Sequence, residues 1–278
     1  MPAHAPILAL LALSVAFAPP AVAPAQAQAA PAGVSPWSDD HASRARLLGG
    51  EVEDGARWAG LEIEMDPGYK TYWRHPGDSG IPAEFDWTGS RNVASVEIAW
   101  PAPGRFEDPF GAYYGYLDHV VLPLKVTPED PTEPAVLSLS LFYGVCKEIC
   151  IPATAEASLT LPPEPIASEV AIARALEAVP TPTPLGETDG PLAVLAVEPA
   201  GEDALGVRVR APEGAILLAE GPDDRWFLAP GAAPDAAGVF TVEIAHAPKD
   251  AAGPVPVRLT LVAGEDAIEV ETLASLPE

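Results

Sequence analysis

Proline is the residue type that most limits what this chain can fold into. The 278 residues include 34 prolines, and short apolar segments lie between them. Proline disrupts the interior of a helix, whereas a β-protein can place it in turns and at sheet edges. The sequence therefore predicts an all-β protein in which short strands alternate with turns.

Alternation of apolar and polar residues identifies strands in the first half of the chain. Leu61, Ile63 and Met65 alternate with glutamates, and the run over 136–143 alternates in the same way. This period of two is typical of a strand with one buried face. About eight such segments, separated by turn signals, predict a β-sandwich over residues 45–162.

Two segments of this sandwich have features of their own. Residues 105–118 are rich in phenylalanine and tyrosine and are expected to form an aromatic loop. Residues 120–126 read as a strand with an internal proline, Pro123, which favours a position at a sheet edge or bulge.

The second half of the chain divides by composition. Residues 163–190 are expected to form a short helix, with Ser168 as its N-cap, and then a stiff proline-rich linker. Residues 191–278 return to strand-like alternation and predict a second, smaller β-sandwich of unknown role. In this domain Trp226 is interpreted as a packing residue and His246 as a surface residue.

The N-terminus has the pattern of a secretory signal peptide over residues 1–29. Its apolar run over 7–17 is shorter than the ~20 residues that span a bilayer, and small residues suited to cleavage follow it. Residues 30–44 are expected to be a flexible lead-in. No later segment has the length and apolar character of a membrane span, so we expect an exported protein in an oxidising compartment.

Acidic residues dominate the charge of the chain. It has 40 acidic and 15 basic residues, for a net charge of −25. A field of this sign opposes binding to nucleic acid and to anionic membrane surfaces. Neither is expected as a partner.

Both cysteines of the chain, Cys146 and Cys150, lie in one short stretch. An extended chain would hold their Cα atoms about 13 Å apart, whereas a disulfide needs less than about 7 Å. A bonded pair therefore predicts a tight turn joining two strands. As a staple, so short a loop contributes only about 2 kcal/mol in the chain-entropy model. Exposed disulfides of this kind are instead typical of thiol–disulfide exchange.

A metal site is the other chemistry open to two thiolates. Cu(I) suits soft sulfur ligands, and a third ligand would have to come from Met65, His75 or His119, none of which has diagnostic spacing. Zinc would need four ligands. We therefore expect no metal and no cofactor. A copper-tolerance protein that handles Cu(I) and a binding module with a structural disulfide remain as alternatives.

Four separated motifs resemble a known family. They are Gly68-Tyr-Lys-Thr-Tyr-Trp-Arg74, Glu107-Asp-Pro-Phe110, Val121-Leu-Pro-Leu-Lys-Val126 and Tyr143-Gly-Val-Cys-Lys-Glu-Ile-Cys-Ile-Pro152. In this order, over residues 45–162, they resemble the N-terminal periplasmic domain of the disulfide reductase DsbD. The three-residue gap between the cysteines is shorter than in DsbD itself and is closer to the ScsB-like group.

The resemblance implies a fold, a location and an activity. It implies an immunoglobulin-like sandwich in the periplasm that relays electrons from a membrane-embedded disulfide reductase to thioredoxin-like or other oxidised proteins. If the protein is an enzyme, it is of the protein-disulfide reductase type; the sequence does not decide this point.

The resemblance also implies roles for individual residues. Cys150 would form the mixed disulfide with a partner, and Cys146 would close the internal bond. Phe110 would be the aromatic residue of a cap loop that shields the pair, and Tyr69 and Tyr72 would lie near the site. No thioredoxin-like Cys-x-x-Cys motif occurs in the sequence, so the electron donor is expected to be another polypeptide.

Overall fold

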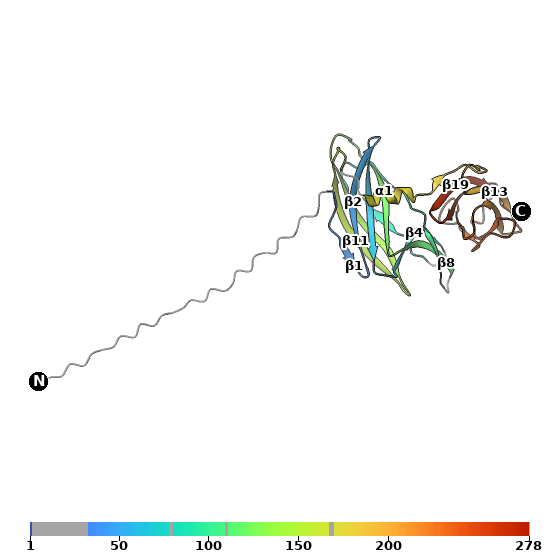
Figure 1. Cartoon of the computed structure of the whole chain (residues 1–278), viewed down its shortest axis with the longest axis horizontal. Helices are drawn as coiled ribbons and strands as arrows, with labels where there is room; N and C mark the ends of the chain where they lie inside the picture. The colour runs from blue at the N-terminus through green and yellow to red at the C-terminus, as the bar shows by residue number, and fades with distance from the viewer. Residues whose placement is uncertain (2–32, 78–79, 109–110, 167–169, 278) are drawn as a thin grey trace.

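Two β-domains lie side by side in the structure, a computed structural model that describes Met1 and residues 33–77, 80–108, 111–166 and 170–277 (Figure 1). Apart from Met1, the predicted signal peptide falls outside these residues. Among the described residues, no helix is both long and apolar enough to cross a membrane.

The first domain is a sandwich of two largely antiparallel sheets. One sheet has the order β1 (Ser38–Asp40), β2 (Ser43–Glu53), β3 (Ala56–Met65), β9 (His119–Thr127) and β6 (Ser95–Ile98). The other has the order β11 (Cys150–Leu161), β10 (Ala135–Cys146), β4 (Lys70–Gly77), β8 (Gly111–Leu117) and β7 (Gly104–Asp108), and the short β5 (Glu84–Asp86) pairs with β10.

The alternating residues of the sequence form the core between these sheets. Leu61 and Ile63 of β3 are buried, and Leu139 and Leu141 of β10 meet them in one hydrophobic cluster. The residues between them on β10 are more exposed, as the period of two predicts. The all-β sandwich predicted from the sequence is therefore confirmed.

Two local expectations were wrong. Residues 105–108 and 111–117 are not a loop, because β7 and β8 pair with each other, from Gly104 opposite Gly115 to Asp108 opposite Gly111. Phe106 lies on β7, and Tyr113, Tyr114 and Tyr116 lie on β8. The sequence shows no alternation of apolar and polar residues here, because aromatic side chains occur on both faces of β8.

The second error concerns Pro123, because β9 lies between β3 and β6 rather than at an edge. The carbonyl oxygen of Pro123 accepts a hydrogen bond from the backbone N of Ala99, just beyond the end of β6 at Ile98. In an antiparallel strand the N–H and C=O of one residue point the same way. The Pro123 nitrogen, which carries no hydrogen, therefore faces Ala99, one residue beyond the end of β6.

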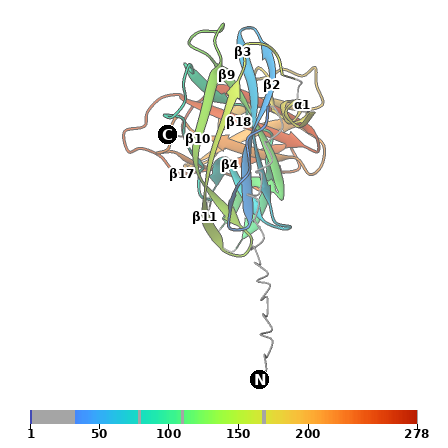
Figure 2. The same ribbon diagram turned by 90° about the vertical axis from the view of Figure 1, so that its left-hand side faces the viewer.

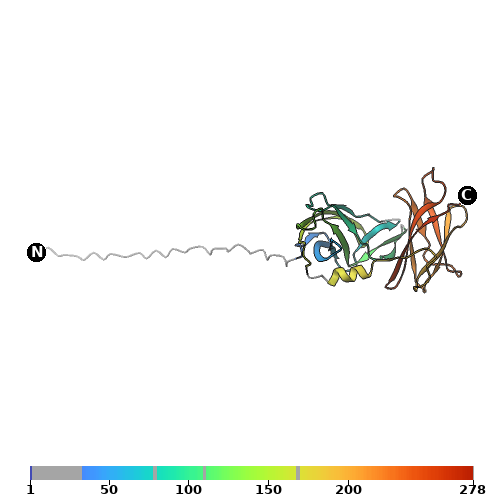
Figure 3. The same ribbon diagram turned by 90° about the horizontal axis from the view of Figure 1, so that it is seen from above.

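The helix α1 (Val170–Glu177) follows the first sandwich and packs against its side (Figure 3). It buries Ile172 and Ala175 against a cluster that includes Leu48 and Val121. Gly60 leaves room for Ile172, since a Cβ there would lie 3.0 Å from the Ile172 side chain. The predicted N-cap, Ser168, lies outside the described residues.

The second domain is also a sandwich, and its strands run across those of the first domain (Figure 2). One sheet has the order β12 (Thr181–Pro182), β19 (Asp266–Ala274), β18 (Val255–Ala263) and β15 (Ile216–Glu220). The other has the order β13 (Ala193–Pro199), β14 (Ala204–Arg210), β17 (Val239–His246) and β16 (Phe227–Pro230). Trp226 is buried between them and His246 is exposed, as predicted.

The β12–β19–β18–β15 sheet is covered on both faces. Leu217 and Leu259 belong to the core of the second sandwich. Leu218 follows Leu217, and Val262 lies three positions after Leu259, so both side chains are on the opposite face of the sheet. They are buried in the same cluster as the core of the first sandwich. The two domains therefore share a continuous apolar contact.

Candidate functional site

The two cysteines close the hairpin formed by β10 and β11, which we call the cysteine hairpin. The ladder runs in register from Ala135 opposite Leu161 to Cys146 opposite Cys150. The cysteines form a disulfide, with their Cα atoms 4.1 Å apart. The turn that the sequence predicted for a bonded pair is present.

The two cysteines differ in their access to solvent. Cys146 is only 4% exposed, whereas Cys150 is exposed at the end of the hairpin. Next to it, Ile149 is 77% exposed, which makes it the most exposed large apolar side chain of the described residues after Met1. An approaching thiol or protein therefore meets Cys150 first.

The hydroxyl of Tyr72 lies against both sulfur atoms. Its oxygen is 2.9 Å from Cys146 Sγ and 2.8 Å from Cys150 Sγ. A tyrosine O–H can donate one hydrogen bond. A hydrogen bond of this kind is stronger when the acceptor is a charged thiolate than when it is a disulfide sulfur. Tyr72 is therefore placed to stabilise whichever sulfur becomes a thiolate.

Two glycines fix the ring of Tyr72. A Cβ on Gly144 would lie 2.9 Å from the ring, and a Cβ on Gly80 would lie 2.8 Å from it. Backbone from β10 and from the segment after β4 can therefore approach both sides of the ring closely. Thr71, the neighbour of Tyr72, donates its hydroxyl to the Gly144 carbonyl at 2.9 Å, which ties β4 to the cysteine hairpin.

The β7–β8 hairpin adds aromatic rings to the site. Tyr113 meets Tyr72 edge-on, with 5.9 Å between ring centroids, and Phe106 stacks on Tyr113 at 5.5 Å. The Lys70 ammonium lies 5.4 Å from the centroids of both Phe106 and Tyr113. Neither Phe106 nor Tyr113 was expected at the site from the sequence. Their spacing in an aromatic-rich segment was the only available signal.

The other aromatic residues named from the sequence stand differently. Tyr69 is half-buried, and the Lys147 ammonium lies 5.3 Å from its ring centroid. Lys147 also donates to the Pro67 carbonyl at 3.1 Å. Tyr69 thus flanks the turn of the cysteine hairpin through Lys147. Phe110, named as the cap residue, lies outside the described residues.

The three side chains considered as further copper ligands have other surroundings. Met65 is buried in the core of the first sandwich. His119 Nε2 lies 3.0 Å from Glu62 Oε1. The His75 ring lies 6.3 Å from the Phe227 ring of the second domain. Within the described residues, no group of three or more histidine, cysteine or acidic side chains is arranged to hold a metal ion.

The fold and the site together define a class of protein. It has two β-sandwiches, and the first sandwich carries a disulfide at the end of a hairpin. Residues 44–162 match the family described as "Thiol:disulfide interchange protein DsbD, N-terminal". This match covers the first sandwich and is to the family that the four motifs resemble.

One solved structure supports the fold beyond the first sandwich. The crystal structure of the N-terminal periplasmic domain of ScsB from Proteus mirabilis matches with a TM-score of 0.66 at 21% identity, covering 88% of this chain and 100% of that chain. That coverage exceeds the first sandwich, so it includes strands of both domains. At this identity the likeness establishes the fold.

Other comparisons add little. A chimeric titin Z1Z2 structure covers 86% of this chain and 100% of its own at 12% identity, but its TM-score is 0.21. Tandem immunoglobulin repeats of Dlar reach a TM-score of 0.23 at 10% identity, covering 79% of this chain and 88% of that chain. Neither value supports an argument. No curated protein sequence gives a significant match.

Proposed function

We propose that this protein is a periplasmic thiol–disulfide exchange protein that relays electrons through Cys146 and Cys150. The observation that carries the proposal is the asymmetry of the pair. One sulfur is exposed at the end of a hairpin, the other is buried, and the Tyr72 hydroxyl reaches both. A staple would need neither an exposed sulfur nor a polar group aimed at the bond.

The reaction follows from thiol–disulfide chemistry. In the reduced protein, the Cys150 thiolate attacks one sulfur of a partner disulfide, forming a mixed disulfide and releasing the first partner thiolate. The Cys146 thiolate then attacks Cys150 Sγ, which closes the internal disulfide and releases the second partner thiolate. The partner gains two electrons, and the two partner thiolates take up protons to the extent that their pKa values require.

The roles of the two cysteines follow from their access. A partner protein can reach Cys150, whereas Cys146 needs to move only within the hairpin to resolve the mixed disulfide. The Tyr72 hydroxyl can donate to the Cys150 thiolate before the first step and to the Cys146 thiolate before the second. In the reverse direction, a reduced dithiol protein attacks Cys150 and reduces the Cys146–Cys150 disulfide.

The partners follow from the same chemistry and from the family. The electron donor is a dithiol carried by a membrane-embedded disulfide reductase, and the acceptors are thioredoxin-like or other oxidised proteins of the periplasm. The family name and the periplasmic domain of ScsB support this location. The predicted signal peptide would deliver the chain there.

The reduction potential of the pair tests the proposal. We expect a value above about −300 mV in glutathione or dithiothreitol redox buffers, because structural disulfides of secreted proteins lie below that level. We also expect the oxidised protein to be reduced by a reduced thioredoxin-like protein. A potential far below −300 mV together with no reduction by that protein would favour the structural alternative.

A further inference from the structure

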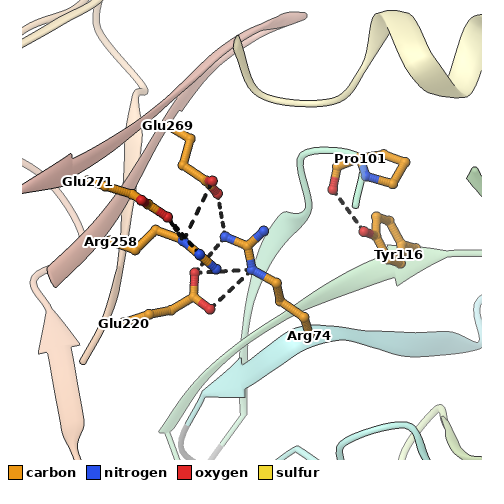
Figure 4. Close-up of polar contacts among 7 residues, drawn as sticks. All are labelled: Arg74, Pro101, Tyr116, Glu220, Arg258, Glu269 and Glu271. Atoms are coloured by element: carbon orange, nitrogen blue, oxygen red, sulfur yellow. Dashed lines mark hydrogen bonds and ion pairs between the residues drawn. The ribbon is translucent and has the colours of Figure 1, made fainter. Parts of the chain in front are cut away.

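The second sandwich is joined to the first by Arg74 of β4. Its Nε lies 3.1 Å from each carboxylate oxygen of Glu220, and its Nη2 donates to Glu220 Oε2 at 2.6 Å and also to Glu269 (Figure 4). The three side chains are only 16–19% exposed. One cation of the first domain is therefore held between two carboxylates of the second.

This contact is strong for charged groups so close to the surface. Burial alone would lower the pKa of Arg74, but hydrogen bonds and charge from Glu220 and then Glu269 outweigh it and raise that pKa. Arg258 completes the cluster from inside the second domain, since it donates to Glu271 at 2.7 Å and lies 3.6 Å from Glu269 (Figure 4). Removing one partner of such a cluster leaves a buried charge uncompensated, so the loss of one side chain is expected to destabilise the contact.

A bulge in β4 carries Arg74 to the second domain. Tyr72 pairs with Gly115 and Gly77 pairs with Tyr113, so five steps along β4 correspond to only two along β8. The extra residues cannot follow the ladder, and a bulge of this kind re-aims side chains. Arg74 and its neighbour His75 both face the second domain, where the ring of His75 meets that of Phe227.

The same segment returns over the Tyr72 ring. A Cβ on Gly80 would lie 2.1 Å from the Pro76 side chain and 2.8 Å from the Tyr72 ring. Ile81 packs on the cluster of Tyr72, Tyr113 and Cys146. The chain therefore leaves the sulfur site at Tyr72, contacts the second domain at Arg74, and then covers Tyr72.

We propose that the second sandwich braces the redox site and that Arg74 is the positioning residue of this brace. By fixing the bulge of β4, the Arg74 contacts with Glu220 and Glu269 hold the Tyr72 hydroxyl at the two sulfurs. The inference rests on the proposed function, because positioning matters only if the pair exchanges. It gives the second domain a role that requires no site of its own.

The first test compares Arg74→Met with a matched control, Arg46→Met. Arg46 forms a similar ion pair with Glu62, at 2.6 Å, in the opposite sheet of the first sandwich. Both variants lose one positive charge. The rate of alkylation of the reduced cysteines by iodoacetamide at pH 7 is measured with each. We expect Arg74→Met to react about fivefold more slowly than wild type, a coupling typical of residues that share neighbours, and Arg46→Met to react at the wild-type rate.

A double variant separates positioning from general loss of stability. If Arg74 acts through Tyr72, Arg74→Met slows alkylation in the wild-type background but has no further effect in a Tyr72→Phe background, although it lowers Tm in both. Glu220→Gln, which keeps the side-chain shape and lies on the other domain, is expected to act in the same direction as Arg74→Met. It serves in its place if Arg74→Met does not fold.

Three results would overturn the brace. They are wild-type alkylation rates for both Arg74→Met and Glu220→Gln, equal slowing by Arg46→Met, and undiminished slowing in the Tyr72→Phe background. Failure of the proposed function looks different. In that case the wild-type disulfide itself is not reduced by a thioredoxin-like dithiol protein, whatever the variants do.

Discussion

The Tyr72 hydroxyl lies 2.8 Å from Cys150 Sγ, the exposed sulfur of the pair. Tyr72 comes from β4 and Cys150 from β11, two strands that are separated in the sheet by β10. This contact joins the exposed cysteine to the strand whose Arg74 forms ion pairs with the second domain.

Replacing Tyr72 with phenylalanine removes the donor and keeps the ring. A hydrogen bond to a charged group contributes about 1.5–3 kcal/mol, so we expect the reduced cysteines of Tyr72→Phe to be alkylated about tenfold more slowly at pH 7. The rate–pH profile should also move to higher pH. The measurement is the iodoacetamide rate from pH 5 to 10, with Tyr69→Phe as the control. A Tyr72→Phe profile that overlays the wild type would remove Tyr72 from the site.

Adding a methyl group at Gly144 should displace the Tyr72 ring. Its Cβ would lie 2.9 Å from the Tyr72 ring and 3.0 Å from Ile81. Overpacking of this kind costs about 1–3 kcal/mol, so Gly144→Ala should lower the free energy of unfolding and slow alkylation. Gly190→Ala is the control, because the nearest atom to its Cβ would be 3.8 Å away. Equal stability of the two variants in urea unfolding would contradict the packing described.

Ile149 provides a test of partner contact that leaves the chemistry intact. Its side chain is 77% exposed beside Cys150. An exposed substitution changes stability by less than about 0.5 kcal/mol. We expect Ile149→Ser to react with dithiothreitol at the wild-type rate but more slowly with a thioredoxin-like protein. The prediction is wrong if Ile149→Ser reacts more slowly with both reductants to the same extent, or reacts with both at the wild-type rate.

Alkaline pH should weaken the first sandwich through Tyr116. Burial raises the pKa of Tyr116 well above its ordinary value of 10.0, and the charge of Arg74 opposes this only in part. In the unfolded chain the phenol ionises near pH 10. The stability that Tyr116 contributes is thus fully present below pH 10 and decreases as the pH rises beyond it.

Tyr116→Phe makes this dependence measurable. The phenol donates to the Pro101 carbonyl at 2.8 Å (Figure 4), and a hydrogen bond of this kind contributes about 1 kcal/mol. At pH 8 the variant should therefore be less stable than wild type by about that amount. The difference should narrow above pH 10, because only the wild type can ionise at this position on unfolding. A difference that stays constant from pH 8 to 11.5 would argue against the assignment.

The sequence was informative where a local pattern decides the structure. Leu61, Ile63 and Met65 identified a buried strand face because a strand exposes alternate residues, and the spacing of Cys146 and Cys150 required a turn if they bond. The prediction for Pro123 was wrong because the position of a proline in a sheet depends on which neighbouring strand its missing N–H would face. That strand is distant in sequence.

The rest of the site depends on contacts between distant segments. Phe106 and Tyr113 join the cluster of Tyr72 and Cys146 only because β7 and β8 pair next to β4. Arg74 meets Glu220 and Glu269 across more than one hundred positions of sequence. No local pattern encodes such pairs, so the sequence alone indicates no role for the second domain.

Trapping of the mixed disulfide tests the central claim most directly. Reduced Cys146→Ala and Cys150→Ala are each mixed with an oxidised thioredoxin-like protein, and the disulfide-linked complex is quantified on non-reducing gels. The account predicts that Cys146→Ala accumulates the complex through Cys150, whereas Cys150→Ala, with its one thiol buried, forms little. Equal trapping by the two variants, or trapping by Cys150→Ala alone, would contradict it.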